Sequence, residues 1–204
     1  MPNQLFINKK IQTFDKKITV IGDKSLSIRW VLLASQTVGK SKGYNLSMSE
    51  DIVATLDSIK KLGIKVLIHN NYCEIFGNGI NGFKYKSGLV IDAKNSGTLG
   101  RLILGLLIKS PKKIKIIGDT SLSKRDFSRV TIPLEKFGAK FFYKKKNKLP
   151  LSILGSGLPK GINYIESKGS AQCKSSVMLA ALNSSGTTFI KAKKSRNHSE
   201  LLFK

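Results

Sequence analysis

The sequence has few of the side chains that build metal centres and disulfide frameworks. It contains two cysteines and two histidines in 204 residues, namely Cys73, Cys173, His69 and His198. The cysteines lie 100 residues apart without a CxxC pair, and the histidines are isolated from each other. Two such thiols are typical of buried apolar side chains in a reducing compartment rather than of a disulfide or a zinc site. We therefore expect a cytoplasmic protein without a protein-bound metal.

Long apolar runs are missing as well. The longest one, Leu102–Ile108, is far shorter than the roughly 20 residues that a membrane-spanning helix needs. The first ten residues, Met1–Lys10, lack the continuous apolar stretch of a secretion signal. Hydrophobic residues still make up 41% of the chain, enough for the core of one domain or of two small ones. We expect no membrane partner.

Acidic residues are scarce, with 12 Asp and Glu against 36 Lys and Arg and a formal net charge of +24. This balance favours an anionic partner such as nucleic acid, lipid or a small substrate. However, 31 of the 36 basic residues are lysines, and they are scattered along the chain with only one triplet, Lys144–Lys146. A nucleic-acid footprint clusters on one stripe or face. We favour a solvated lysine surface with no specific nucleic-acid binding, and a basic nucleic-acid-binding protein is the alternative.

Arginine is rare, and its positions are informative. Three of the five arginines, Arg29, Arg125 and Arg196, lie within a few residues of a predicted helix start. The planar guanidinium group binds carboxylate or phosphate at two points, which an ammonium group cannot do. The pattern therefore indicates anion-binding positions at these three residues. The alternative is that each arginine only pairs with a neighbouring aspartate.

The chain repeats itself with a period of about 73 residues, which is the signature of a repeated supersecondary unit. Three segments open with small polar residues and continue as apolar helices: 22–34, 95–107 and 169–181. Matching basic residues follow at intervals of 72 and 73 residues: Arg29, Arg101 and Lys174. A second helical segment comes later in each copy: 49–63, 123–138 and 195–204. The third copy stops within that helix, so we expect a piece of a longer protein.

The first copy predicts a strand at 18–21, a helix after the Gly22 loop and a second strand at 44–48. A second helix follows, with Ser49 as its N-cap and Gly63 after its end. Its apolar positions, Ile52, Leu56, Ile59 and Leu62, fall on one face. The segments 64–68 and 72–76 then read as a hairpin.

The second copy predicts a strand at 113–118, a helix over about 125–137 and strands at 140–143 and 151–154. Pro133 favours a kink or a shortened start of that helix, and Gly138 ends it. Each copy is therefore a β-α-β-α-β-β unit, and the fold class is α/β (α+β) with mixed sheets. We place the units at about 18–90, 91–162 and 163–204, with residues 1–17 outside them.

The first helix of each unit begins with small residues, such as Ser25, Gly97 and Ser170. Small residues let a ligand approach the free N–H groups of the first helical turn, where the helix dipole favours anions. If the units pack around a quasi-threefold axis, the three helix starts would form one concentrated anion site. The alternative is that small residues only permit close helix packing.

Five segments in register resemble one known family. They are Gly22–Arg29, Asn95–Thr98, Arg125, Gly169–Ser175 and Ser195–Glu200. Together they resemble the EPSP synthase (3-phosphoshikimate 1-carboxyvinyltransferase) family of enolpyruvyl transferases, over the chain from about residue 11 onward. The resemblance implies an inside-out α/β barrel domain made of three such units, the first of two similar domains. It also implies that residues 18–204 are an incomplete N-terminal domain, and that residues 1–17 pack with an absent C-terminal domain.

The resemblance further implies an activity, with no metal or organic cofactor. The family transfers the enolpyruvyl group of phosphoenolpyruvate to the 5-hydroxyl of shikimate 3-phosphate and releases phosphate, in the shikimate pathway. Such a protein would be a monomer whose partners are these two small anions. The implied shikimate 3-phosphate residues are Lys24, Ser25, Arg29, Ser170, Gln172 and Arg196. The implied phosphoenolpyruvate residues are Lys24, Gly97, Arg125 and Gln172.

The resemblance also has departures and limits. Ile28 stands where many members have Asn or His, and Ala171 replaces a serine of one branch. The family's acid and base residues belong to the other domain, so this chain is expected to hold no catalytic residue and to be inactive alone. The related UDP-N-acetylglucosamine enolpyruvyl transferases carry Lys-Asn in place of Lys24-Ser25 and use a loop cysteine. A further alternative is a truncated chain with no folded role.

Overall fold

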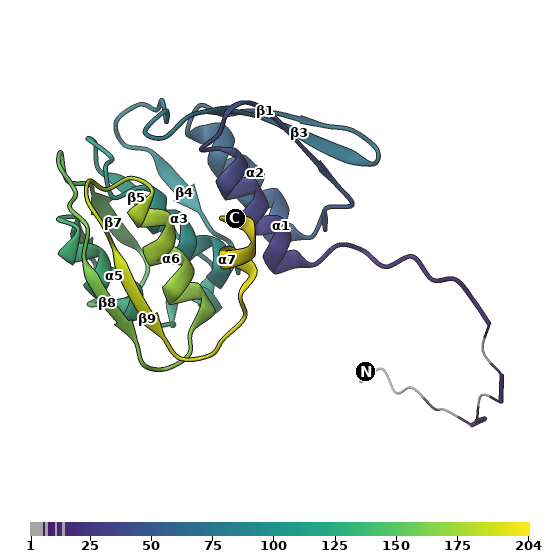
Figure 1. Ribbon diagram of the computed structural model, residues 1–204. Helices are drawn as coiled ribbons and strands as arrows, with labels where there is room; N and C mark the ends of the chain where they lie inside the picture. Colours follow the sequence, from purple (N-terminus) through teal and green to yellow (C-terminus); the bar gives the residue numbers. More distant parts are fainter. Residues whose placement is uncertain (1–5, 7, 11, 14) are drawn as a thin grey trace.

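The computed structural model describes residue 6, residues 8–10, 12 and 13, and residues 15–204. The expected packing of residues 1–17 falls in part on residues 1–5, 7, 11 and 14, which lie outside the described residues. Within the described part, no helix is long and apolar enough to cross a membrane. The N-terminal arm leaves the globule just before the first helix (Figure 1).

Helices and strands alternate along the described chain, as the repeat predicts. The first group contains α1 (Lys24–Ala34), β1 (Val38–Tyr44), α2 (Glu50–Lys61), β2 (Lys65–Ile68) and β3 (Tyr72–Asn78). The second contains β4 (Val90–Asp92), α3 (Gly97–Leu106), β5 (Ile114–Ile117), α4 (Thr120–Ser123), α5 (Ser128–Lys136), β6 (Lys140–Tyr143) and β7 (Leu151–Leu154). The third contains β8 (Asn163–Glu166), α6 (Ala171–Ala181), β9 (Phe189–Ala192) and α7 (His198–Leu202).

The strands form three separate sheets, one for each group. Their orders are β1-β3-β2, β4-β5-β7-β6 and β8-β9. In the first two sheets the last strand of the group lies between its neighbours and pairs with both in antiparallel fashion. The leading strand of the second and third groups, β4 or β8, runs parallel to its neighbour. This topology confirms the predicted mixed α/β fold class.

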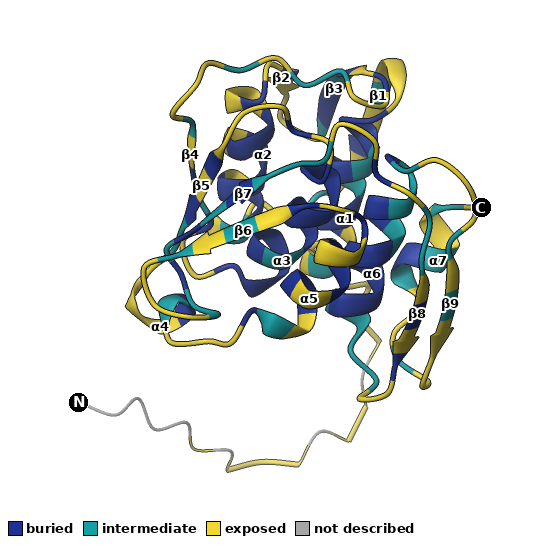
Figure 2. Cartoon of the chain, turned by 90° about the vertical axis from the view of Figure 1, so that its left-hand side faces the viewer, coloured by how far each residue is buried: buried dark blue, intermediate teal, exposed yellow. Residues whose placement is uncertain are grey.

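The helices α1, α3 and α6 occupy the centre, and the sheets lie around them (Figure 2). Nine of the ten residues of α3 are buried, so this helix is surrounded on almost every side. It packs closely on α6, where a Cβ atom at Gly105 would lie 2.1 Å from the carbonyl oxygen of Ser176. The hydroxyl of Ser176 also donates to the carbonyl of Arg101 at 2.9 Å. The absence of a side chain at Gly105 therefore sets the spacing of the two helices.

Several predicted elements of the first two groups are confirmed. Helix α2 begins after Ser49 and buries Ile52, Leu56 and Ile59 at 1% exposure or less. Gly63 follows it with a φ of +86°, a conformation in which a residue with a Cβ is strained. The predicted hairpin is the antiparallel pair of β2 and β3. The strands at 140–143 and 151–154 are present with those bounds.

Three predicted elements are wrong. Residues 18–21 form no strand; Ile18, Val20 and Ile21 are 67–76% exposed, so their apolar side chains are not buried against a sheet. The strand expected at 44–48 lies at 38–44, and it ends where Asn45 takes a left-handed φ of 52°. The helix expected from about Arg125 begins at Ser128, after the separate short helix α4. Pro133 lies inside this shortened helix.

Glu166 ties the third sheet to the helices. Its side chain is 4% exposed and accepts hydrogen bonds from Arg129 at 2.9 Å and from the hydroxyl of Tyr164 at 2.6 Å. The backbone N–H groups of Lys168 and Ser170 donate to the same carboxylate. Burial alone would raise the pKa of Glu166, but these hydrogen bonds and the charge of Arg129 hold it below its usual 4.5. The carboxylate therefore fixes the loop from which α6 begins.

The contact of α3 with α6 predicts a stability effect at Gly105. In Gly105→Ala the added methyl group meets a backbone oxygen, which cannot rotate away. Overpacking should outweigh the better helix propensity of alanine and lower the free energy of unfolding by about 1–3 kcal/mol. Urea denaturation measures this change. Gly157→Ala is the control, because a Cβ there meets nothing within 4 Å; equal stability of the two variants would contradict the packing argument.

The pKa of Glu166 predicts an acid-dependent stability. A carboxyl group whose pKa is lower in the folded than in the unfolded chain stabilises the fold above its unfolded pKa, and this stabilisation is lost as the pH falls through the folded pKa. Glu166→Gln should therefore lower the free energy of unfolding by about 2 kcal/mol at pH 7. The difference from the parent chain should shrink below the usual pKa of 4.5. Chemical denaturation at several pH values tests this, with the exposed Glu135→Gln as control.

Candidate anion-binding site

The three central helices begin in the same way. The N-cap side chains of α1, α3 and α6 are Asp23, Ser96 and Ser170, and each accepts the N–H of the third residue after it. None of the three helices has an acidic residue in its first turn. The N-cap carboxylate of Asp23 lies at the positive dipole end of α1, whereas the ends of α3 and α6 have neutral serine caps, and their remaining first-turn N–H groups favour an anion.

Gln172 joins the starts of α3 and α6. Its side-chain oxygen accepts from Arg101 Nη1 at 2.9 Å, and its nitrogen donates to the hydroxyl of Thr98 at 3.0 Å. Arg101 Nη1 also lies 3.3 Å from the carbonyl of Gly97. Two of the three helix starts thus share one hydrogen-bonded network, which supports the expectation that they converge.

Asp51 joins the starts of α1 and α3. Its carboxylate forms an ion pair with the ammonium group of Lys24 at 2.9 Å, and the Ser96 side chain lies near enough to lower the pKa of Asp51. Burial opposes the ionisation of Asp51, but the bonds from Ser96 and Lys24 outweigh it and lower the pKa of Asp51. The Lys24 side chain is still 52% exposed, so a ligand can reach it.

Arg29 is the most deeply enclosed cation of the site, at 4% exposure. Its Nε donates to Ser199 at 2.9 Å and its Nη2 to Ser175 at 3.1 Å, while Nη1 donates to the carbonyl of Ser25 at 3.0 Å. No carboxylate of the described residues forms an ion pair with it. Burial and then the charge of Arg196 lower the pKa of Arg29. Hydroxyls therefore orient this guanidinium group without neutralising it.

Two further guanidinium groups lie next to Gly97. A Cβ at this position would lie 2.8 Å from Arg101 Nη1 and 3.0 Å from Arg125 Nη1. Arg101 is held over the ring of Phe127 at 5.1 Å from its centroid, and burial lowers the pKa of Arg101. Arg125 is exposed. The missing side chain at Gly97 therefore lets both guanidinium groups lie against the start of α3.

The structure brings some of the expected residues together and places the others beside residues that were not predicted. Lys24 lies by Asp51, Gly97 lies by Arg125, and Gln172 lies between α3 and α6. The exposed Arg196 is close enough to Arg29 for its charge to lower the pKa of Arg29. Ser25 contributes its backbone carbonyl to Arg29, and the Ser170 hydroxyl caps α6.

Other residues of the site escaped the sequence argument, above all Arg101, Ser175 and Ser199. Arg101 carries a signal, because it repeats Arg29 at an interval of 72 residues. The two serines lie inside the motif segments 169–175 and 195–200. Their partner, Arg29, is 146 and 170 residues away. Only the tertiary structure reveals a pairing over such distances.

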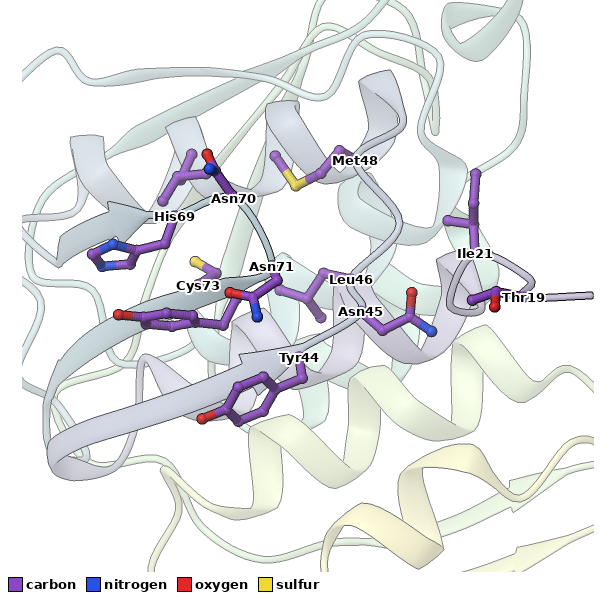
Figure 3. A pocket seen from close by; sticks show the side chains of 12 residues that line it. Thr19, Ile21, Tyr44, Asn45, Leu46, Met48, His69, Asn70, Asn71 and Cys73 are labelled. Carbon is purple, nitrogen blue, oxygen red and sulfur yellow. The ribbon is translucent and has the colours of Figure 1, made fainter.

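The largest cavity among the described residues lies elsewhere. It has a volume of about 700 Å³ and is lined by segments 19–21, 44–48 and 68–73. Figure 3 shows Tyr44, Asn45 and His69 among its walls. The ring of His69 stacks on Tyr72 at 4.2 Å. None of the expected ligand-binding residues lines this cavity.

Comparison with known proteins gives a consistent result. A sequence model of the family described as EPSP synthase (3-phosphoshikimate 1-carboxyvinyltransferase) matches residues 8–204. The chain is 39% identical over 193 residues to 3-phosphoshikimate 1-carboxyvinyltransferase of Bacillus subtilis, covering 94% of this chain and 45% of the relative. It is 40% identical over 183 residues to the protein of that name from a Ruegeria species, and the match covers 89% of this chain and 40% of the relative.

A solved structure of EPSP synthase from Acinetobacter baumannii matches the fold with a TM-score of 0.85 and 33% sequence identity. The match covers 91% of this chain and 42% of that one. The chain therefore spans less than half the length of the relatives that it matches. The family match over nearly the whole sequence, together with the shared fold, shows that this chain belongs to the EPSP synthase family.

Proposed function

We propose that this chain forms the substrate-binding half of a 3-phosphoshikimate 1-carboxyvinyltransferase. In the proposed reaction, the enolpyruvyl group of phosphoenolpyruvate is transferred to the 5-hydroxyl of shikimate 3-phosphate, and phosphate is released. The observation that carries the proposal is the buried guanidinium group of Arg29. It is oriented by Ser175 and Ser199 and has no carboxylate partner among the described residues. A buried charge is costly unless it gains a partner, and a phosphate dianion is a suitable one.

Shikimate 3-phosphate is assigned to the side of the site formed by α1, α6 and the segment before α7. Its proposed contacts are Lys24, Ser25, Arg29, Ser170, Gln172 and Arg196. The closeness of Arg196 to Arg29 supports this assignment, because two guanidinium groups that repel each other both gain from one phosphate group. The free first-turn N–H groups of α6 add a further attraction for the anion.

Phosphoenolpyruvate is assigned to the start of α3, with Lys24, Gly97, Arg125 and Gln172 as proposed contacts. The two guanidinium groups beside Gly97 support this, because the carboxylate and phosphate of this substrate each accept two-point hydrogen bonds. Gln172 bridges α3 and α6 and is therefore suited to contact both substrates. Lys24, at the start of α1 and paired with Asp51 near Ser96, has a similar intermediate position.

The remaining features of the protein are proposed together. The acid and base residues come from a C-terminal domain of a longer protein, with which residues 1–17 pack. Residues 18–204 form the N-terminal domain, with units at about 18–90, 91–162 and 163–204. The whole protein is a cytoplasmic monomer that uses no metal or organic cofactor and binds no specific nucleic acid. The repeated sheet order supports the division into units.

The site arginines separate this function from nucleic-acid binding. The variant Arg125→Ala/Arg196→Ala removes two exposed charges from the site. Each charge-assisted hydrogen bond contributes about 1.5–3 kcal/mol, so the affinity for shikimate 3-phosphate should fall more than about tenfold. Nonspecific DNA binding should weaken only slightly, because it depends on the number of charges rather than on their place and the variant removes two of 36 basic residues. Isothermal titration calorimetry and DNA binding at several salt concentrations measure both affinities.

The matched control is Lys144→Ala/Lys146→Ala, which removes the same charge from the lysine triplet. It should bind shikimate 3-phosphate like the parent chain and should weaken DNA binding as much as the arginine variant does. The proposal fails if the arginine variant keeps its affinity for shikimate 3-phosphate. It also fails if the two double variants lose that affinity to the same extent.

A further inference from the structure

Lys174 is a buried cation in the second turn of α6, at 6% exposure. In the repeat it corresponds to Arg29 and Arg101, at an interval of 73 residues from the latter. Its ammonium group forms an ion pair with the Oε1 atom of Glu200, and it donates to the carbonyl of Arg196 at 3.4 Å. Lys174 therefore contacts both Glu200 of α7 and the backbone of Arg196, one of the proposed shikimate 3-phosphate contacts.

Glu200 is a potential competitor of the ligand. Its charge acts on Arg29, where it opposes the lowering of the pKa of Arg29 by burial and by Arg196. Neither Arg29 nor Arg196 forms an ion pair with any described carboxylate. The second carboxylate oxygen of Glu200, Oε2, is buried and has no hydrogen-bond partner among the described residues. An arginine fork that reached both oxygens would gain a two-point contact.

We propose that Lys174 is a positioning residue that holds Glu200 away from Arg29 and Arg196 and so keeps both arginines free for the phosphate of the substrate. The inference rests on the proposed function, which assigns these arginines to shikimate 3-phosphate. Lys174 neutralises Glu200 locally, so that the two arginines leave a charge of +2 facing a phosphate dianion. Without Lys174, the carboxylate would take the place of the substrate phosphate.

Polar contacts contribute to the position of α7, so the loss of Lys174 can change where Glu200 lies. Leu201 and Leu202 are 58% and 36% exposed, so α7 buries little apolar surface there. Polar contacts to α6 and α1 help to position it: Lys174 holds Glu200, Ser199 donates to Ser175 at 2.6 Å, and Arg29 Nε donates to Ser199 at 2.9 Å. A purely structural role of Lys174 would be to anchor α7. The two roles predict different results when the Glu200 charge is removed from a Lys174 variant. Only the proposed role predicts that the affinity for shikimate 3-phosphate then recovers.

The experiment compares Lys174→Met with Lys174→Met/Glu200→Gln in calorimetric binding of shikimate 3-phosphate to the full chain. We expect the single variant to bind about tenfold more weakly or worse, because Glu200 then pairs with an arginine. The double variant should recover to within about threefold of the parent chain, since glutamine offers no competing charge. Lys174→Arg should keep the parent affinity. If Lys174 only anchors α7, the double variant binds no better than the single one, and the proposal is overturned.

Lys194→Met is the matched control. Lys194 is exposed and lines the same cavity as Lys174 and Glu200, so the substitution removes the same charge nearby. It should leave the affinity unchanged, and a loss equal to that of Lys174→Met would overturn the proposal. Ligand-free crystal structures of the parent chain and of Lys174→Met give a readout that needs no binding. We expect Glu200 to lie within 4 Å of an Arg29 or Arg196 nitrogen in Lys174→Met but not in the parent chain. An unmoved Glu200 in Lys174→Met contradicts the inference. If the parent chain binds no shikimate 3-phosphate, the proposed function fails while these structures still decide the role of Lys174.

Discussion

The close contact of α3 with α6 is the constraint on which the site depends. Gly105 lets the two helices approach until a methyl group would meet the backbone of Ser176. At this spacing, Gln172 on one helix reaches both Thr98 and Arg101 on the other. The same central position of α1, α3 and α6 gives the chain a core of helices with sheets outside (Figure 2). Packing and the proposed anion binding therefore depend on one arrangement of helices.

This arrangement concentrates positive charge where water is largely excluded. Burial lowers the pKa of both Arg29 and Arg101, because removal from water disfavours the charged form of each guanidinium group. Serine hydroxyls and carbonyls satisfy their N–H groups, and these neutral partners leave the charge uncompensated. A bound anion would offset part of the cost of burying this charge, so the ligand should raise the free energy of unfolding.

The sequence predicts best where local physics decides the structure. Helix α2 has its apolar face, its cap position and its final glycine in the sequence, and the hairpin of β2 and β3 has Asn70 and Asn71 between two largely apolar segments. Strand β1 was misplaced because Val38–Tyr44 is mostly exposed and glycine-containing, so its pairing with β3 leaves no apolar pattern. The same holds for the candidate site. Motif residues such as Lys24 and Gly97 could be named, whereas Ser175 and Ser199 join Arg29 only through the packing of distant segments.

The chemistry of this site favours binding over acceleration of a reaction. Arg29 and Arg101 are fixed by hydrogen bonds before any ligand arrives, and phosphate and carboxylate groups keep most of their charge throughout an enolpyruvyl transfer. Interactions that are equally strong in the ground state and the transition state improve binding without lowering the barrier of the chemical step. In the proposed function they would hold two mutually repelling anions next to each other, which supplies the orientation that a two-substrate reaction needs. On this argument, the proposed half-site orients the substrates, and groups that change protonation during the reaction must face it from outside these helices.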